Sequence, residues 1–457
     1  MKKLPYFKNY DIRGRIGTDL TKDVMGRIAR AYAQVFAPRL VVIGHDIRPT
    51  SSGFADALAA GFVEMGTDVI RLGLCGTEEV YFATEYFKTD GAMMVTASHN
   101  PIQYNGIKIV GPGCTPVSEA TGLEKIEEVI RLGLPTPPAA APGRLREATC
   151  RAEYAVRVAS FLGDAPVRGI RMLVNAGNGV AGPAFDAVLA ALEDRGCEIA
   201  VERLHHVPDG SFPNGIPNPM LPETHPQSAE PLRASGADLG IAWDGDFDRC
   251  FFFDETGAFV DGEYMVALIA SSFLESKEAP CIVHDVRVVR AVREIVIAGG
   301  GTPCIAPVGH SNMKRRMRET GAVYGGEMSA HHYFREFMFC DSGMIPWVLV
   351  LRLMARSGRS LGSLVADFRE RFPSSGEINL DISDTSAALA RIERAFGPEA
   401  KTVDRLDGLS LEFENWRLNL RPSNTEPILR LNLEAGGDRA LLETKLRLVT
   451  AILEKAD

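Results

Sequence analysis

A serine flanked by histidine, asparagine and proline is the first residue of this chain whose setting suggests chemistry. Ser98 lies in the segment 96–101, directly after the apolar run 92–95, which is typical of a buried strand. A side chain at a strand end lies on an exposed but firmly held loop, where a nucleophile or a carrier of a phosphoryl group can work. Turns rich in Ser and Asn are common, so this segment alone does not decide its role.

Three aspartates on alternate residues form a second candidate site. Asp244, Asp246 and Asp248 follow the apolar run 239–243, so their carboxylates can converge on one hard cation at a strand end. Ligation by oxygen alone suits Mg²⁺, which also keeps a position open for a phosphate oxygen. An EF-hand loop begins with the same spacing, but Arg249 stands where that loop requires glycine. A phosphatase with Asp244 as its nucleophile stays open as an alternative.

A third segment, residues 421–427, carries groups that can bind phosphate. It lies between the apolar runs 416–420 and 428–433, which are typical of strands. A guanidinium, two hydroxyls and an amide in a tight turn can hold a phosphate without a metal, although a polar hairpin turn needs no ligand. The candidate ligands are Arg421, Ser423, Asn424 and Thr425.

A fourth segment, residues 326–332, is a loop that opens with glycine and contains Glu327 and Ser329. Carboxylate and hydroxyl groups can hydrogen-bond the vicinal hydroxyls of a sugar, but a plain connecting loop can have the same composition. His331 and His332 have no third ligand at the spacing of a metal site, so we expect no zinc here.

The glycine pattern of residues 177–182 matches the dinucleotide-binding fingerprint, because it lies between an expected strand and an expected helix. Pro183 fits the first turn of that helix. The same strand and helix recur elsewhere in the chain without these glycines. We therefore predict a structural turn and no dinucleotide site.

Three stretches share the order strand, helix, strand: residues 40–72, 170–204 and 281–307. Their strands are continuous apolar runs, as in buried parallel sheets, and glycine follows each helix. Two of them also share a local pattern, His-Asp-Ile-Arg at 45–48 and His-Asp-Val-Arg at 284–287. The pattern predicts three tandem related α/β domains with mixed sheets and a smaller C-terminal α+β domain around a central cleft. A linker rich in Pro and Ala is expected at 132–142, and the predicted domains are 1–145, 146–257, 258–371 and 372–457.

Composition excludes several classes of function. The chain has 457 residues and a net charge of −9, which argues against a nucleic-acid binder. Its apolar runs fall short of the roughly 20 residues of a membrane span, and its start lacks the apolar core of a signal peptide. The eight cysteines form no CxxC pair. We expect a cytoplasmic protein with reduced thiols.

Taken together, these segments resemble the α-D-phosphohexomutase family over nearly the whole chain. Residues 96–101 are similar to its phosphoserine loop and residues 326–331 to its sugar-recognition loop. The segment 244–249 is similar to its metal loop, with Phe247 where many members have glycine. Residues 421–427 are similar to its phosphate-binding loop, with Pro422 at a position that smaller residues often fill.

The resemblance implies a role for each matching residue. Ser98 would carry the phosphoryl group and, with Asp244, Asp246 and Asp248, would bind the metal. Arg13 and Lys108 would stabilise charge and handle the hydroxyl proton, and His99 would orient the loop. The implied substrate-binding residues are Arg249, Arg287, His310, Glu327, Ser329, His331, Arg421, Ser423, Asn424, Thr425 and Arg430.

The resemblance also implies the reaction. It is the reversible conversion of mannose 6-phosphate and mannose 1-phosphate, with Mg²⁺ and a hexose 1,6-bisphosphate primer, feeding GDP-mannose synthesis. Arg287 stands where some members that also accept glucose phosphates have lysine, so dual specificity stays open. A sugar phosphatase and a non-catalytic phosphosugar-binding protein are the remaining alternatives. We expect a phosphosugar as the only partner, with no nucleic acid, membrane or obligate protein partner.

Overall fold

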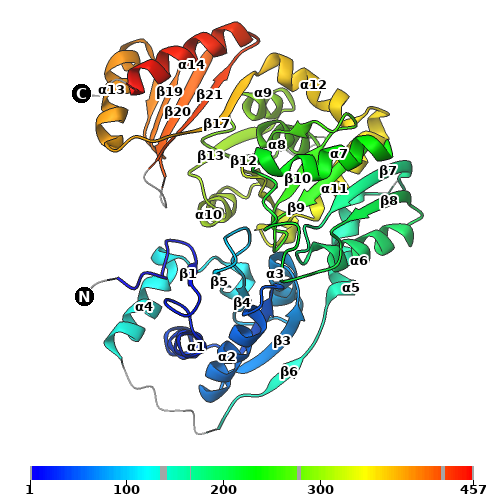
Figure 1. Cartoon of the computed structure of the whole chain (residues 1–457), viewed down its shortest axis with the longest axis vertical. Coiled ribbons are helices and arrows are strands. Elements are labelled where there is room, and N and C mark those ends of the chain that lie inside the picture. Colours follow the sequence, from blue (N-terminus) through cyan, green and yellow to red (C-terminus); the bar gives the residue numbers. More distant parts are fainter. Residues whose placement is uncertain (1–2, 134–140, 165, 275–278, 424–427, 455–457) are drawn as a thin grey trace. The chain divides into compact units, whose positions relative to one another are not determined.

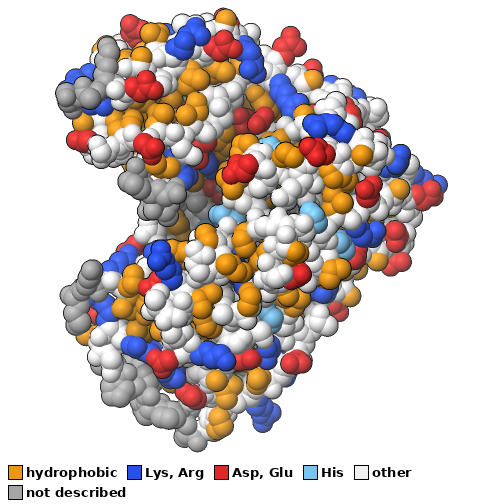
Figure 2. Space-filling view, viewed as in Figure 1, with side chains coloured by type: hydrophobic (Ala, Val, Ile, Leu, Met, Phe, Trp, Pro, Cys, Tyr) orange, Lys and Arg blue, Asp and Glu red, His pale blue; other side chains and the backbone are white. Residues whose placement is uncertain are grey.

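The structure is a computed structural model that describes residues 3–133, 141–164, 166–274, 279–423 and 428–454 (Figure 1). It divides into two compact units. Unit 1 comprises Met1–Phe259 and His331–Ser360, and unit 2 comprises Val260–Ala330 and Leu361–Asp457. Among the described residues, no helix is long and apolar enough to span a bilayer. Figure 2 shows Lys and Arg side chains interspersed with Asp and Glu side chains on the visible face.

The first sheet of unit 1 has the strand order β1-β5-β4-β2-β3-β6. Its centre is parallel, with β2 between β3 and β4, whereas β5 runs antiparallel to β4 and β1. Helices pack on it through apolar faces, which bury side chains such as Ile28 and Leu58 completely. The strands are β1 (Ile12–Arg15), β2 (Leu40–His45), β3 (Asp68–Leu74), β4 (Ala92–Val95), β5 (Tyr104–Val110) and β6 (Leu145–Glu147), and the helices are α1 (Lys22–Phe36), α2 (Ser51–Glu64), α3 (Thr77–Tyr86) and α4 (Leu123–Leu132).

The second sheet of unit 1 repeats this arrangement in the order β11-β10-β9-β7-β8. Strand β7 lies parallel to β8 and β9, and β10 is antiparallel to β9. The rest of unit 1 is a hairpin and a helix whose Trp347 packs against Phe185, with ring centroids 5.2 Å apart. The elements are α5 (Arg151–Ala159), β7 (Arg168–Asn175), α6 (Ala181–Glu193), β8 (Glu198–Leu204), α7 (Pro226–Ser235), β9 (Leu239–Trp243), β10 (Cys250–Phe253), β11 (Phe259–Val260), β15 (His332–Phe334), β16 (Cys340–Asp341) and α11 (Ile345–Ser357).

Unit 2 begins with the same parallel core for a third time. Strand β12 lies between β13 and β14 and is parallel to both, so the predicted three related α/β domains are confirmed. The elements are α8 (Gly262–Ser271), β12 (Cys281–Asp285), α9 (Arg290–Ala298), β13 (Thr302–Ala306), α10 (His310–Thr320), β14 (Tyr324–Gly326) and α12 (Leu361–Arg371).

The C-terminal part of unit 2 is the predicted α+β domain. Its antiparallel sheet has the order β17-β21-β20-β19-β18, and alternate leucines such as Leu418, Leu420 and Leu431 are fully buried beneath two helices. The elements are β17 (Ser374–Leu380), α13 (Thr385–Phe396), β18 (Thr402–Asp404), β19 (Leu409–Glu412), β20 (Trp416–Pro422), β21 (Leu429–Ala435) and α14 (Arg439–Leu453).

One connecting segment differs from its sequence-based prediction. Arg421 was predicted to lie in a turn, but β20 continues through it, because the ladder pairs Arg421 with Arg430 of β21. Most of the expected linker at 132–142 lies outside the described residues.

Candidate active site

The loop after β4 holds Ser98 in a left-handed conformation, with φ +48°. Such a conformation costs a non-glycine residue about 1–3 kcal/mol, so neighbouring groups must hold it. The Ser98 N–H donates to Thr96 Oγ1 at 2.9 Å, and its carbonyl accepts from Arg48 Nη2 at 2.8 Å. Arg48 Nη1 also donates to the carbonyls of Pro101 and Tyr104, each at 3.1 Å. The buried Arg48 side chain therefore clamps the loop backbone, a role that the sequence did not suggest.

The Ser98 hydroxyl lies in a set of charged and polar groups. Its Oγ donates to Asp244 Oδ2 at 2.5 Å and lies 3.0 Å from His99 Nδ1. Arg249 donates to the same Asp244 oxygen through Nε at 2.9 Å and Nη2 at 2.7 Å. Burial and the charge of Arg249 hold the pKa of His99 well below its usual range, so its imidazole is neutral. A neutral ring adds no charge to the serine loop.

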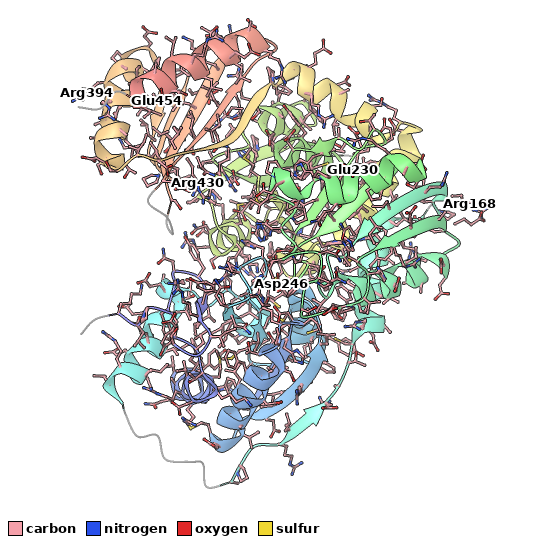
Figure 3. All side chains as sticks on the ribbon, viewed as in Figure 1. Arg168, Glu230, Asp246, Arg394, Arg430 and Glu454 are labelled. Atoms are coloured by element: carbon pink, nitrogen blue, oxygen red, sulfur yellow. The ribbon has the colours of Figure 1, made fainter. Side chains whose placement is uncertain are left out.

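The three predicted metal ligands converge. Asp244, Asp246 and Asp248 are buried, and one ligand atom of each lies within 4.8 Å of the others. The Oδ2 atoms are engaged, that of Asp244 by Arg249 and those of Asp246 and Asp248 by Lys108 Nζ. The Oδ1 atoms of Asp244 and Asp246 are buried without a hydrogen-bond partner. Buried carboxylate oxygens without a hydrogen-bond partner fit a hard cation such as Mg²⁺. Figure 3 shows Asp246 inside unit 1, in contrast to Arg168 at its edge.

Two cations predicted to act in catalysis are fixed near Ser98. Lys108 Nζ lies 2.7 Å from Asp246 Oδ2 and also donates to Asp248. Burial opposes its charge, but the neighbouring aspartates raise the Lys108 pKa above its usual range. Arg13 donates to Asn100 Oδ1, two residues beyond Ser98, and to Asp11 at 2.7 Å. Lys108 is therefore charged in this site, and Arg13 is held beside the serine loop by Asn100 and Asp11.

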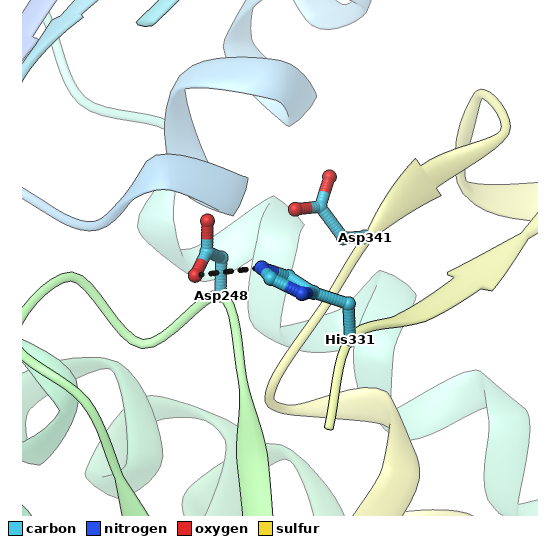
Figure 4. A group of neighbouring side chains, drawn as sticks. All are labelled: Asp248, His331 and Asp341. Carbon is cyan, nitrogen blue, oxygen red and sulfur yellow. Dashed lines mark ion pairs between the residues drawn. The ribbon is translucent and has the colours of Figure 1, made fainter. Parts of the chain in front are cut away.

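His331 lies beside two carboxylates from other segments of unit 1 (Figure 4). Its Nε2 is 3.6 Å from Asp248 Oδ1, and Asp341 completes a group whose ligand atoms lie within 4.8 Å. The sequence shows no third ligand at metal spacing for the histidine pair, and the structure brings Asp248 and Asp341 to His331 but not to His332, so the absence of zinc stays a prediction. His332 is buried elsewhere, and burial lowers its pKa to about 3.

The glycines of residues 177–182 face protein. A Cβ on Gly179 would lie 2.7 Å from the Gly245 carbonyl oxygen, and one on Gly182 would lie 2.0 Å from the His206 carbonyl oxygen. The N–H of Val180 donates to Gly245 at 3.2 Å. The metal loop thus occupies the space that a cofactor pyrophosphate would need, which supports the prediction of a structural turn.

Unit 2 gathers three of the predicted substrate-binding arginines around one carboxylate. Glu377 lies 3.2 Å from Arg287 Nη1, 3.2 Å from Arg421 Nη2 and 3.4 Å from Arg430 Nη1. Burial opposes its charge, but the arginines, led by Arg287, lower its pKa. Because Arg287 is also paired with Asp285, it is Arg421 and Arg430, which share Glu377, that leave positive charge for an anion. Glu377 itself was missed, because no pattern in the sequence marks a lone glutamate on β17.

Residues 326–330 of the predicted sugar-recognition loop lie in the same unit, whereas His331 belongs to unit 1. Glu327 is buried, accepts from the Gly309 N–H at 2.8 Å and lies 4.0 Å from Arg287 Nη2. Gly309 precedes His310, the first residue of α10. Ser329 is half-buried in the loop after β14. Glu327 thus lies near the cluster of Arg287, Arg421 and Arg430, through Arg287.

The predicted phosphate loop is only partly described. Asn424 and Thr425 lie outside the described residues. Ser423 is half-buried, and its N–H donates to the Ile428 carbonyl at 2.9 Å. Arg421 is buried on β20, and burial together with Arg287 lowers its pKa.

Four consecutive stretches of the chain match the four domains of one family. Residues 4–133, 152–257 and 261–372 match phosphoglucomutase/phosphomannomutase alpha/beta/alpha domains I, II and III. Residues 377–451 match the phosphoglucomutase/phosphomannomutase C-terminal domain. These matches include every segment from which the site residues come.

Relatives that match over nearly their full length indicate the same family. A phosphomannomutase of Salmonella typhimurium (strain LT2) is 48% identical over 456 residues, which cover 100% of both chains. A relative from Xanthomonas campestris pv. campestris, described as phosphohexose mutases, is 46% identical and covers 98% of this chain and 99% of its own. A solved phosphoglucomutase/phosphomannomutase family protein from Burkholderia thailandensis has a TM-score of 0.86 at 29% identity, with 100% and 99% coverage. The chain belongs to the phosphoglucomutase/phosphomannomutase family.

Proposed function

We propose that this protein is a phosphomannomutase, which interconverts mannose 6-phosphate and mannose 1-phosphate through phospho-Ser98 and a hexose 1,6-bisphosphate. The observation that carries the proposal is the 2.5 Å contact of Ser98 Oγ with Asp244, at the head of three converging carboxylates. The Salmonella relative carries the same functional name. The product would feed GDP-mannose synthesis.

The first half-reaction transfers a phosphoryl group from the protein to the sugar. The bond between phosphorus and Ser98 Oγ breaks, and a bond forms to the free hydroxyl oxygen of the sugar phosphate. The hydroxyl proton of the sugar passes to Ser98 Oγ, which leaves as a hydroxyl. The charged Lys108, held by Asp246 and Asp248, is our candidate to stabilise the oxygens between which this proton moves. Arg13 and Arg249 supply fixed positive charge around the serine loop. Bound Mg²⁺ would neutralise charge on the transferring group.

The second half-reaction returns the other phosphate of the bisphosphate to Ser98. Arg287, Arg421 and Arg430 are proposed to bind the phosphate that does not react, since their guanidinium groups gather around Glu377. Ser423, Asn424 and Thr425 complete that set in the proposal. Glu327, Ser329, His310 and His331 are proposed to contact the sugar or its phosphate. Because the two phosphates exchange roles, one phosphate site serves both half-reactions.

Three further assignments belong to this proposal. We assign the metal as Mg²⁺, because its ligands are oxygen only. The domain boundaries stay as predicted, at 1–145, 146–257, 258–371 and 372–457. A cytoplasmic location fits the eight cysteines, all of which are free thiols.

Dual specificity for mannose and glucose phosphates is the second candidate, favoured by the Xanthomonas relative described as phosphohexose mutases.

Purified protein with Mg²⁺ and glucose 1,6-bisphosphate should convert mannose 1-phosphate to mannose 6-phosphate, and Ser98→Ala should not. Activity with glucose 1-phosphate at similar kcat/KM would favour dual specificity. Release of inorganic phosphate in place of the 6-phosphate would favour a phosphatase, and binding without turnover a non-catalytic protein.

A further inference from the structure

The start of helix α3 meets the metal loop within unit 1. Thr77, the first residue of the helix, is completely buried, and its Oγ1 donates to Asp246 Oδ2 at 2.6 Å. The Thr77 N–H also donates to the Asp246 carbonyl at 3.2 Å. Lys108 Nζ lies 3.5 Å from Thr77 Oγ1. Because an ammonium group can only donate, the threonine hydroxyl hydrogen is directed to Asp246.

A steric contact next to this hydrogen bond fixes the same two segments. Phe247 follows Asp246 in a left-handed conformation, with φ +47°, and its ring is completely buried. The ring lies against Gly76, where an added Cβ would be 2.0 Å from Phe247 Cε1. The ring and the glycine are therefore complementary in shape.

We propose that Thr77 is a positioning residue for the metal ligand Asp246, and that the packing of Phe247 on Gly76 sets the register of the two segments. The inference rests on the proposed function, in which Asp246 binds the metal. Thr77 and Lys108 engage Oδ2 of Asp246, whereas Oδ1 is left without a partner. Fixing one oxygen orients the other, as outer groups do for metal ligands generally.

The direct test measures binding of Mn²⁺ alone, from the spectroscopic signal of the free ion. Thr77→Val keeps the shape of the side chain and removes the hydroxyl, so the Mn²⁺ dissociation constant should rise about 10-fold or more, as for lost partners of metal ligands. Thr77→Ser should restore wild-type affinity. Thr84→Val is the matched control, because Thr84 is buried on the same helix but bonds the Val80 carbonyl. Unchanged affinity in folded Thr77→Val would overturn the proposal.

A double-mutant cycle tests the steric part. Gly76→Ala should weaken Mn²⁺ binding and lower the melting temperature, because its methyl group displaces the Phe247 ring. In a Phe247→Gly background the same change should cost little, since the ring is gone. Penalties that add in the double variant would show that the two residues act independently and would overturn this step.

The outcomes separate this inference from the function on which it rests. If wild-type protein binds Mn²⁺ but lacks mutase activity, the proposed function fails while the comparison of variants still decides the role of Thr77. If Thr77→Val loses kcat with an unchanged KM for mannose 1-phosphate, and Thr77→Ser recovers it, the positioning role extends to turnover. If wild-type protein binds no Mn²⁺, both proposals fail.

Discussion

Two loops with nearly the same sequence, residues 45–48 in unit 1 and 284–287 in unit 2, have the same local structure and different surroundings. In each, the arginine N–H donates to Oδ1 of the aspartate, at 2.9 Å for Asp46 and 2.7 Å for Asp285. In unit 1 the Arg48 guanidinium then donates to backbone carbonyls of the serine loop. In unit 2 the Arg287 guanidinium instead donates to Asp285 Oδ2, at 2.6 Å and 3.0 Å.

The pKa values of the two aspartates shift in opposite directions. Burial raises the pKa of Asp46, and Arg48, with Nε 3.6 Å away, does not reverse this. Burial also opposes the charge of Asp285, but Arg287 lowers the pKa of that carboxyl below its usual range. The repeated sequence therefore sets the turn, whereas the rest of each domain decides whether the arginine holds a backbone or a set of acids.

The largest effect is expected from breaking the backbone clamp. Arg48→Met leaves the carbonyls of the serine loop without their buried donor, and removing one partner of a buried charged group costs on the order of 3–5 kcal/mol. Scanning calorimetry should show a lower melting temperature. Mutase activity should fall at least about 100-fold, because the strained Ser98 loses its support. Normal activity in Arg48→Met would show that the clamp is dispensable.

Glu263, a buried acid in unit 2, extends the comparison of the pKa values of buried carboxylates. Burial, with Asp261 nearby, raises the pKa of Glu263 to about 7. The folded form therefore keeps a proton that the unfolded chain loses, so this group's contribution to stability falls by about 3 kcal/mol as the pH rises from about 4.5 to about 7. Glu263→Gln should remove that dependence and stabilise the protein at pH 8 while changing little at pH 5.

The measurement is the melting temperature of wild type and variant across that pH range. The exposed Glu230 provides the matched control, and Glu230→Gln should follow the wild type at every pH. A constant difference between wild type and Glu263→Gln would contradict the assignment.

Replacing Arg287 should weaken substrate binding and should not disturb the serine loop. Arg287→Met removes a charge-assisted partner of an anion, worth on the order of 1.5–3 kcal/mol, so KM for mannose 1-phosphate should rise more than kcat falls. Steady-state kinetics of Arg287→Met and Arg48→Met, measured side by side, test this expectation. If both variants lost only kcat, the two arginines would have the same role, and the contrast would fail.

The smallest expected effect distinguishes a residue of unit 2 that contacts the sugar from one that binds its phosphate. Glu327→Ala should cost about 1–3 kcal/mol in kcat/KM and change the ratio of mannose to glucose phosphate. Arg421→Ala should weaken both sugars alike, because phosphate does not distinguish them. Measuring kcat/KM for both 1-phosphates in each variant decides the matter. A changed ratio in Arg421→Ala with an unaffected Glu327→Ala would reverse the assignment.

The sequence predicted features that depend on local patterns. The three parallel cores follow from continuous apolar runs, and the convergence of Asp244, Asp246 and Asp248 follows from alternate spacing after a strand. Thr77 and Arg48 could not be predicted in this way, because their roles arise from contacts 169 and 50 residues away in the chain. Packing between two domains of unit 1 brings Thr77 to Asp246, and the folding of one domain brings Arg48 to Ser98, and no spacing in one sequence records either contact.

The central claim is that Ser98 carries the phosphoryl group and passes it to a sugar. Intact-mass and peptide analysis after incubation with glucose 1,6-bisphosphate tests it directly, followed by a chase with mannose 1-phosphate. We predict one phosphoryl group on Ser98, absent from Ser98→Ala, and its transfer in the chase to give mannose 1,6-bisphosphate without inorganic phosphate. Labelling of Asp244, or label on Ser98→Ala, or release of inorganic phosphate in the chase, would contradict the account.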